Sequence, residues 1–254
     1  MLEAKIKGLA QEKPILLMTH LVLGFPSFEE NRKTVAAFAN AGVELVELQF
    51  PFSEPSADGP VIVKANADSL ENHTSIEECY RFATEMVALH PEVNFLLMTY
   101  VNILFAQGMK SSLSKAKAAG FKGFIIPDLP PEELGDWEQD CQTNEMANVL
   151  IMTPTSSKER LNLIGKKSNG LVYCVGRKGV TGLKTDFGDS LSQQIKEYRS
   201  ATSLPLALGF GVKSAEDVAF LVGKVDIAVI GSKLIEVQLS EGAAGVESFL
   251  KQVR

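Results

Sequence analysis

Eight short apolar runs recur along the chain, and an amphipathic stretch separates each run from the next. The runs are rich in aliphatic and β-branched residues, and each is closed by glycine or by a polar turn, as buried strands are. Strands and helices that alternate in this way are typical of a parallel sheet buried on both faces. Eight such units predict a closed (β/α)8 barrel, and an open, doubly wound sheet is the structural alternative. The predicted strands cover residues 15–23, 45–50, 94–100, 123–127, 148–152, 170–175, 204–210 and 226–232.

The segments between the runs carry helix start and stop signals. Ser27 and Ser75 are each followed by a glutamate three residues later, which is the spacing of a capping box. A helix over residues 2–12 precedes the first strand and is expected to cap the bottom of the barrel, and the segment from Gly242 onward is expected to form the last outer helix. The other predicted helices cover residues 27–42, 75–89, 111–120, 131–142, 157–167, 190–201 and 214–223.

Length and composition restrict the class of protein. A barrel of this kind occupies 254 residues as one unit, and no linker divides the chain, so we predict a single domain over residues 1–254. The formal net charge of -6 disfavours wide contact with nucleic acid. The three cysteines show neither zinc nor disulfide spacing, which fits a reducing cytoplasm. Because the chain has no signal-like or membrane-length apolar stretch, we expect neither export nor membrane insertion.

Two carboxylates occupy the positions where a barrel carries its chemistry, at the carboxyl end of a strand and in the loop that follows. Strand alternation over residues 45–50 places Glu47 and Gln49 on the face opposite Val46. Asp58 follows in the proline-rich loop FPFSEPSADGP. On the residues alone, Glu47 also fits a solvent-facing strand end, and Asp58 also fits a turn former before glycine.

Glycines close the last two strands, in LGFG (208–211) and in IGS (230–232). Barrels often bind phosphate with the loops after strands seven and eight, through bare backbone N–H groups and a helix N-terminus. Either cluster alone also fits an ordinary tight turn. The glycine-rich and charged stretch 176–189 is predicted to be an active-site loop, whose basic residues either attract a phosphate or form a solvated surface, and in which Thr181 is a candidate partner for a carboxylate.

Other chemistry-bearing residues give weaker signals. His20, His73 and His90 show no metal-ligand spacing, so we predict structural roles for all three and no metal site. The sequence contains no nucleophile elbow, and no lysine stands in a predicted strand as a Schiff-base former would. Covalent catalysis is therefore not indicated.

Six motifs in order along the chain resemble the tryptophan synthase alpha subunit family over nearly the whole length. They are VELQFPFSEPSADGP, LMTYVNILF, IIPDLPPEE, GRKGVTG, LGFG and IGS. The resemblance implies a (β/α)8 barrel that cleaves indole-3-glycerol phosphate to indole and glyceraldehyde 3-phosphate by a retro-aldol reaction, without metal or organic cofactor. It also implies a beta-subunit partner, in an α2β2 heterotetramer, that receives the indole.

The resemblance also implies roles for individual residues. Glu47 matches the general acid/base that protonates the indole carbon C3, and Asp58 matches the carboxylate that holds the indole N–H. The residues that match substrate contacts are Tyr173 near the glycerol portion, Tyr100 and Phe210 in the indole pocket, and Thr181 on the closing loop. The residues that match the phosphate cradle are Gly182, Gly211, Gly231 and Ser232.

Five positions depart from the family pattern, namely Val22, Gln49, Glu54, Ser56 and Leu171. Gln49 stands where glycine is usual, so its side chain is expected to intrude on the site or to repack its floor. Glu54 replaces an aspartate that helps the interface to the beta subunit. These departures leave two alternatives to the lyase. One is a weakly active or inactive alpha-like subunit that mainly regulates a beta subunit, and the other is another phosphate-binding barrel isomerase or lyase.

Overall fold

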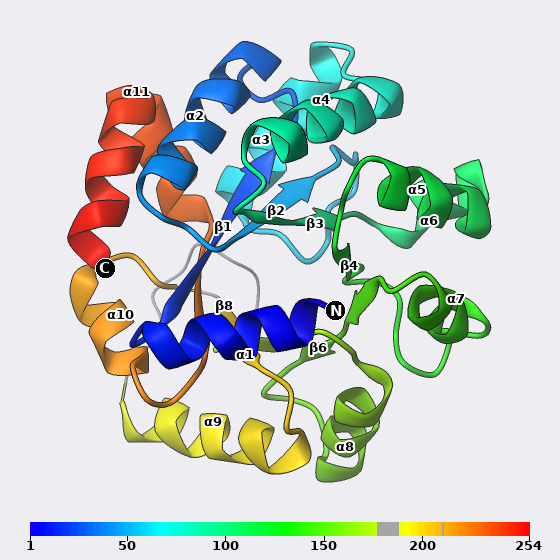
Figure 1. The fold of residues 1–254 in the computed structure, drawn as a ribbon, viewed down its shortest axis with the longest axis vertical. Coiled ribbons are helices and arrows are strands. Elements are labelled where there is room, and N and C mark those ends of the chain that lie inside the picture. The colour runs from blue at the N-terminus through cyan, green and yellow to red at the C-terminus, as the bar shows by residue number, and fades with distance from the viewer. Residues whose placement is uncertain (177–187, 210) are drawn as a thin grey trace.

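The computed structural model describes residues 1–176, 188–209 and 211–254, and it contains a parallel sheet with helices around its outside (Figure 1). The sheet has nine strand segments in the order β5-β4-β3-β2-β1-β9-β8-β7-β6 within the described residues. The strands are β1 (Leu16–Val22), β2 (Leu45–Gln49), β3 (Asn94–Met98), β4 (Gly123–Ile125), β5 (Ala147–Val149), β6 (Ile151–Met152), β7 (Val172–Val175), β8 (Leu206–Gly209) and β9 (Ile227–Ile230). Each of the eight predicted strands is therefore confirmed.

The two ends of this order are consecutive pieces of one predicted strand. β5 and β6 are separated by Leu150 alone, and the Leu150 carbonyl accepts the backbone N–H of Tyr173 in β7 at 3.0 Å. The ring of strands consequently closes through Leu150. The predicted (β/α)8 barrel is confirmed, and the open, doubly wound sheet is wrong because it would leave two free edges.

The helices surround this ring. They are α1 (Leu2–Glu12), α2 (Phe28–Asn40), α3 (Pro60–Glu71), α4 (Ile76–Leu89), α5 (Val101–Gln107), α6 (Met109–Ala118), α7 (Trp137–Thr143), α8 (Lys158–Lys167), α9 (Asp189–Ala201), α10 (Ala215–Leu221) and α11 (Ser232–Val253). Helix α1 lies across the barrel in Figure 1, where Leu2 and Ile6 pack on Leu16 and Leu45 from the first halves of their strands. The additional N-terminal helix therefore caps the bottom of the barrel, as predicted.

Four helices differ from the predicted ones. Helices α3 and α5 lie in segments for which the sequence predicted none. Helix α11 begins at Ser232, and Gly242 (φ 67°, ψ -168°) marks a break inside it rather than its start. Helix α7 begins at Trp137 rather than at residue 131, since Gly135 adopts a positive φ of 51° that interrupts the helix.

The capping predictions have two outcomes. At α4 the reciprocal box is present, because the Ser75 side chain accepts from the backbone of Glu78 and the Glu78 carboxylate accepts from that of Ser75. At α2 the Ser27 hydroxyl accepts the N–H of Glu30. The Glu30 carboxylate instead forms an ion pair with Lys33 at 2.7 Å, which explains why only half of that box forms.

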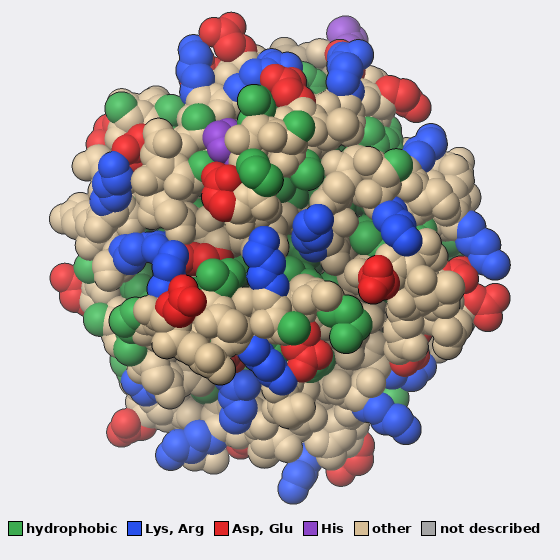
Figure 2. Space-filling model, viewed as in Figure 1, with side chains coloured by type: hydrophobic (Ala, Val, Ile, Leu, Met, Phe, Trp, Pro, Cys, Tyr) green, Lys and Arg blue, Asp and Glu red, His purple; other side chains and the backbone are tan. Residues whose placement is uncertain are grey.

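Strand alternation divides the core into an outer and an inner layer. Val46, Leu48 and Phe50 of the β2 segment pack in the outer layer beneath the helices. Leu45 belongs to the inner layer at the bottom of the barrel, and Glu47 follows it inward on the same face. Figure 2 shows the face that α1 covers, where acidic and basic side chains are interspersed. Among the described helices, none has the length and apolar character needed to cross a membrane.

Candidate active site

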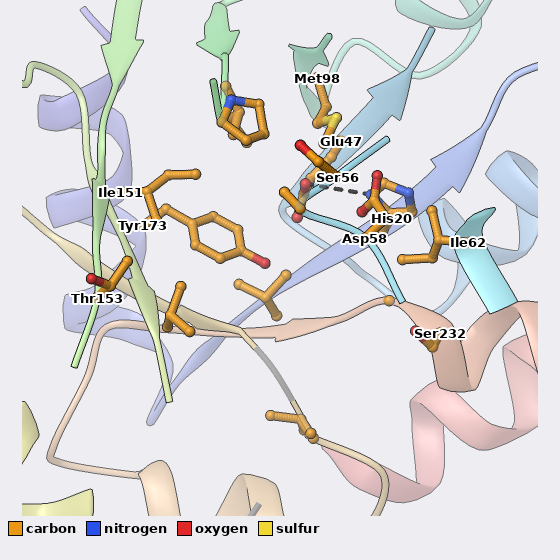
Figure 3. A pocket seen from close by; sticks show the side chains of 18 of the residues that line it. His20, Glu47, Ser56, Asp58, Ile62, Met98, Ile151, Thr153, Tyr173 and Ser232 are labelled. Carbon is orange, nitrogen blue, oxygen red and sulfur yellow. Dashed lines mark hydrogen bonds and ion pairs between the residues drawn. The ribbon is translucent and has the colours of Figure 1, made fainter. Parts of the chain in front are cut away.

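A cavity of about 420 Å³ lies at the carboxyl ends of the strands and the loops that follow them (Figure 3). This is the end of a barrel at which function is expected. Six of the predicted site residues line the cavity together, although they come from five separate segments of the chain. They are Glu47, Asp58, Tyr173, Gly211, Gly231 and Ser232.

Glu47 is a buried carboxylate in β2, with 3% of its surface exposed. The interpretation as a solvent-facing strand end is therefore wrong. Its Oε2 lies 3.4 Å from Nδ1 of His20. Its Oε1 is buried and has no hydrogen-bond partner within the described residues. A buried oxygen without a partner costs about 1–3 kcal/mol, so this atom is available to a hydrogen-bond donor that enters the cavity.

Asp58 is also buried, with 8% of its surface exposed. Its backbone N–H donates to the Pro55 carbonyl at 2.9 Å, so Asp58 does take part in a turn. Its Oδ2 accepts a hydrogen bond from Gln49 Nε2 at 2.8 Å and another from the Tyr100 hydroxyl at 3.0 Å. Burial raises the pKa of this carboxyl, while the neighbouring His20 charge and the two hydrogen bonds act in the opposite direction.

His20 is a site residue that sequence reasoning assigned to a structural role. It lines the cavity, and the parallel register of β1 with β2 places it directly beside Glu47. Its Nε2 lies 2.8 Å from Gln49 Oε1. His20 has no metal-ligand spacing in the sequence, and its pairing with a carboxylate follows from the strand register. The available signal was alternation, which places His20 on the same face as the inner-layer residue Met18.

Burial strongly opposes a charge on His20 and by itself lowers its pKa. The hydrogen bond and negative charge of Glu47, together with the charge of Asp58 and the hydrogen bond to Gln49, outweigh burial and raise the His20 pKa above its ordinary value. Gln49 therefore repacks the floor of the site, which is one of the two outcomes expected from its departure from glycine. Its amide joins His20 to Asp58.

Tyr100 supports the cavity from behind. Its hydroxyl accepts the backbone N–H of Ala57 at 3.0 Å and donates to Asp58. Its ring stacks on Phe52 with centroids 5.0 Å apart. The side chain is 1% exposed, and the residues that line the cavity do not include it. Tyr100 thus meets the site through Asp58. The further candidates Thr181, Gly182 and Phe210 lie outside the described residues, and so do the basic residues between positions 177 and 187.

Tyr173 stands on the opposite wall, and its hydroxyl points across the cavity toward the carboxylates in Figure 3. Burial, followed by the negative charges of Glu47 and Asp58, raises the Tyr173 pKa well above its ordinary value. The phenol is therefore a neutral hydrogen-bond donor. Gly209 in β8 makes room for it, because a Cβ at that position would lie 2.2 Å from the Tyr173 hydroxyl oxygen.

The far end of the cavity has the features of an anion site. Gly231 is the N-cap of α11, so the positive end of the helical stretch that precedes the break at Gly242 meets the cavity there. The Ser232 hydroxyl is buried and has no hydrogen-bond partner in the part of the chain that the structure describes. Lys213 and Lys233 line the same cavity, and the sequence did not single them out. Gly211 has a φ of +107°, which favours glycine.

The remaining departures from the family pattern lie at different distances from the cavity. Ser56 lines it, whereas Glu54 is exposed on the loop beside it. Val22 packs on Phe25 and Ile62. Leu171 is buried in the bottom layer of the core, beneath the cavity. No group of three or more metal-ligating side chains is present among the described residues.

Comparisons with known proteins agree with this fold. The family model described as "Tryptophan synthase alpha chain" matches residues 6–254. The tryptophan synthase alpha chain of Syntrophotalea carbinolica is 45% identical over 254 residues and covers 100% of both chains. A solved structure from Aquifex aeolicus has a TM-score of 0.90 at 28% identity, over 99% of this chain and 96% of the other. The tryptophan synthase a2b2 complex from Pyrococcus furiosus has a TM-score of 0.85 at 27% identity, over 94% and 96%. The chain belongs to the tryptophan synthase alpha chain family.

Proposed function

We propose that this chain is a carbon–carbon lyase that cleaves indole-3-glycerol phosphate to indole and glyceraldehyde 3-phosphate in tryptophan biosynthesis. The observation that carries the proposal is the cavity itself. One wall holds two buried carboxylates, Glu47 and Asp58, and the far end holds the N-terminus of α11. A substrate with an aromatic ring at one end and a phosphate at the other matches this division.

In the proposed reaction, Glu47 gives a proton to the indole carbon C3. The positive charge that develops on the ring is delocalised onto N1, and a nearby Asp58 carboxylate stabilises it. The bond between C3 and the adjacent side-chain carbon then breaks, and its electron pair restores the aromatic ring. The hydroxyl on that carbon becomes the aldehyde, and its proton passes to Glu47. The acid is thereby regenerated, and positioned proton transfer of this kind contributes about 10²- to 10⁴-fold in rate.

The other cavity residues hold the substrate. Tyr173, a neutral donor in the cavity wall, is proposed to contact the glycerol hydroxyls, and the backbone N–H groups at Gly231 and Ser232, which also line the cavity, are proposed to hold the phosphate. Lys213 and Lys233 add positive charge at that end. Thr181, Gly182 and Phe210 keep the roles that the family resemblance implies. No metal or organic cofactor takes part in this scheme.

A tryptophan synthase beta subunit is the proposed partner, in an α2β2 complex like the one named for the Pyrococcus furiosus relative. The exposed Glu54 beside the cavity is a candidate contact. We place the protein in the cytoplasm, which suits its three buried free cysteines.

Release of indole from indole-3-glycerol phosphate tests the proposal, with and without a beta subunit. Glu47→Gln is expected to lower kcat by at least about 10²-fold while the far-UV circular dichroism and phosphate binding stay unchanged. Glu54→Gln, measured without a beta subunit, is the matched control and should retain its rate. Absence of indole in every case would reject the lyase. Normal activation of a beta subunit by the inactive Glu47→Gln protein would identify a separate regulatory role.

A further inference from the structure

Five buried polar side chains form one continuous hydrogen-bonded chain along the floor of the cavity, and we call this chain the relay. The contacts run from Glu47 to His20 at 3.4 Å, from His20 to Gln49 at 2.8 Å, from Gln49 to Asp58 at 2.8 Å and from Asp58 to Tyr100 at 3.0 Å. The two carboxylates that the proposed reaction uses stand at separate points of this chain, and they are joined by an imidazole and an amide. The inference below rests on the proposed function.

The amide of Gln49 fixes the direction of the hydrogen bonds. The Tyr100 hydroxyl accepts the Ala57 N–H, so its own proton is directed to Asp58 Oδ2. Asp58 Oδ2 is therefore an acceptor, and the Gln49 group that faces it must be the NH2. The Gln49 oxygen consequently faces His20 Nε2, and the short contact there requires a proton on Nε2.

This leaves Nδ1 as the titrating nitrogen of His20. Nδ1 faces Glu47 Oε2 at 3.4 Å, and an unprotonated Nδ1 beside a carboxylate oxygen would set two lone pairs against each other. A proton on Nδ1 makes the contact a charge-assisted hydrogen bond and orients the Glu47 carboxyl. Oε1, which has no partner among the described residues, is then the oxygen left for the substrate.

We propose that His20 is a positioning residue of the reaction, which as an imidazolium holds Glu47 Oε2 through Nδ1–H while the Gln49–Asp58 pair holds its Nε2–H. The Glu47 carboxylate that remains after proton delivery to C3 is stabilised by this cation, and the same oxygen, Oε1, later receives the hydroxyl proton. His20 keeps both of its protons throughout, so it is neither consumed nor regenerated. Its loss of the Nδ1 proton at alkaline pH switches the site off.

The charged and titratable surroundings of His20 support a protonated ring. Glu47 comes from β2 and Asp58 from the loop after it, and both raise the His20 pKa. Tyr173 lies across the cavity on β7, and its pKa is raised far out of the working range. On the α11 side the neighbours of the cavity are Gly231, Ser232 and Lys233, and Lys213 lies at the same end. Glu47 and Asp58 are themselves members of the relay, and their charges dominate at His20.

Nuclear magnetic resonance of the unliganded protein tests the relay without any use of activity. The chain has three histidines, so ¹⁵N-histidine labelling gives three pairs of ring signals, and the pair lost in His20→Asn belongs to His20. We expect Nε2 of His20 to stay protonated while Nδ1 titrates. The pH at the midpoint of the Nδ1 titration should be lower in Glu47→Gln than in the parent protein. A neutral ring protonated on Nδ1 would overturn the proposal, and so would an unprotonated ring at about pH 6.

Steady-state kinetics then test whether His20 contributes to catalysis. Asparagine keeps an N–H near the position of Nδ1 but carries no charge. His20→Asn is therefore expected to lower kcat about 10- to 100-fold and to change KM less than about 3-fold. The fall of kcat at alkaline pH should be absent in this variant. His73→Asn is the matched control, because His73 is exposed with a φ of 58° that asparagine tolerates. Gln49→Met removes both amide bonds at similar volume and should move the alkaline limb to lower pH.

An alkaline limb that is the same in the parent protein and in His20→Asn would refute the catalytic part of the inference. If the parent protein released no indole, the proposed function would fail, and the ring-nitrogen spectra would still decide whether the relay exists.

Discussion

Gly209→Ala measures how tightly the cavity wall holds Tyr173. A Cβ at position 209 would lie 2.2 Å from the Tyr173 hydroxyl oxygen and 2.7 Å from Cζ. Ordinary contact between such atoms begins near 3.4 Å, so the ring must move by roughly 1 Å. Tyr173 is a rigid aromatic side chain on β7, and the cavity is the direction in which it can move. The substitution therefore displaces a predicted substrate contact without removing any polar group.

The expected cost follows from these distances. Overpacking of a well-packed position lowers stability by about 1–3 kcal/mol, and the lower entropy of the unfolded alanine chain offsets about 0.5–1 kcal/mol of that loss. A displacement of roughly 1 Å in a substrate-positioning group lowers kcat/KM by about 10²-fold. Urea denaturation measures the first effect, and indole release measures the second.

Tyr173→Phe in the Gly209→Ala background provides the decisive comparison. It removes the closest clashing atom, so the double variant should regain part of the lost stability, and the two changes should not be additive. Gly8→Ala is the matched control, because a Cβ on Gly8 in α1 meets nothing within 4 Å and should be neutral or stabilising. Strict additivity, or a Gly209→Ala protein with the parent's rate, would refute the account of the wall.

Two further predictions concern stability. The buried Glu44 carboxylate accepts a backbone N–H of β1 and pairs with Lys13 and Arg254. Glu44→Ala should therefore lower the free energy of unfolding, measured in urea, by about 1–3 kcal/mol. Glu12 is exposed, and the control Glu12→Ala should change this free energy by less than about 0.5 kcal/mol. His20 has a pKa raised above 6.5 in the folded protein, so the stability it contributes is present below pH 6.5 and is lost as the pH rises through the folded value. Urea midpoints should therefore fall above about pH 6.5 in the parent protein, and the fall should be absent in His20→Asn.

The strands could be predicted because buried strands need continuous apolar runs, and the chain supplies one for each. The helix starts that were missed lack one sequence signal. Helices α3, α5 and α11 begin after Gly59, Tyr100 and Gly231, and none of these N-caps makes a side-chain hydrogen bond to the helix. Capping side chains are what mark a helix start in sequence. A helix start without a capping side chain lacks that signal. Helices α1, α6 and α9 also lack such a cap, and they were predicted from their amphipathic segments instead.

Asp58 and Glu47 could be placed at one end of the barrel from strand order alone, but their surroundings could not. Glu47 is buried for two reasons. It lies on the inward face of β2, which strand alternation predicts, and side chains of the neighbouring strands cover it, which alternation within one strand cannot predict. The register that pairs His20 with Glu47 depends on how the intervening helix packs. A lone histidine in an apolar strand was for this reason assigned to structure.

The presence of Gln49 and the presence of His20 in the buried site depend on each other. A buried amide needs one acceptor for its NH2 and one donor for its oxygen. Asp58 supplies the acceptor and His20 Nε2 supplies the donor. An apolar residue at position 20 would leave the Gln49 oxygen buried without a partner, at a cost of about 1–3 kcal/mol. A glycine at position 49 would leave His20 Nε2 and Asp58 without the group that joins them. The two positions are therefore expected to change together among related chains, and a barrel that carries only one of the pair should be less stable than a barrel that carries both or neither.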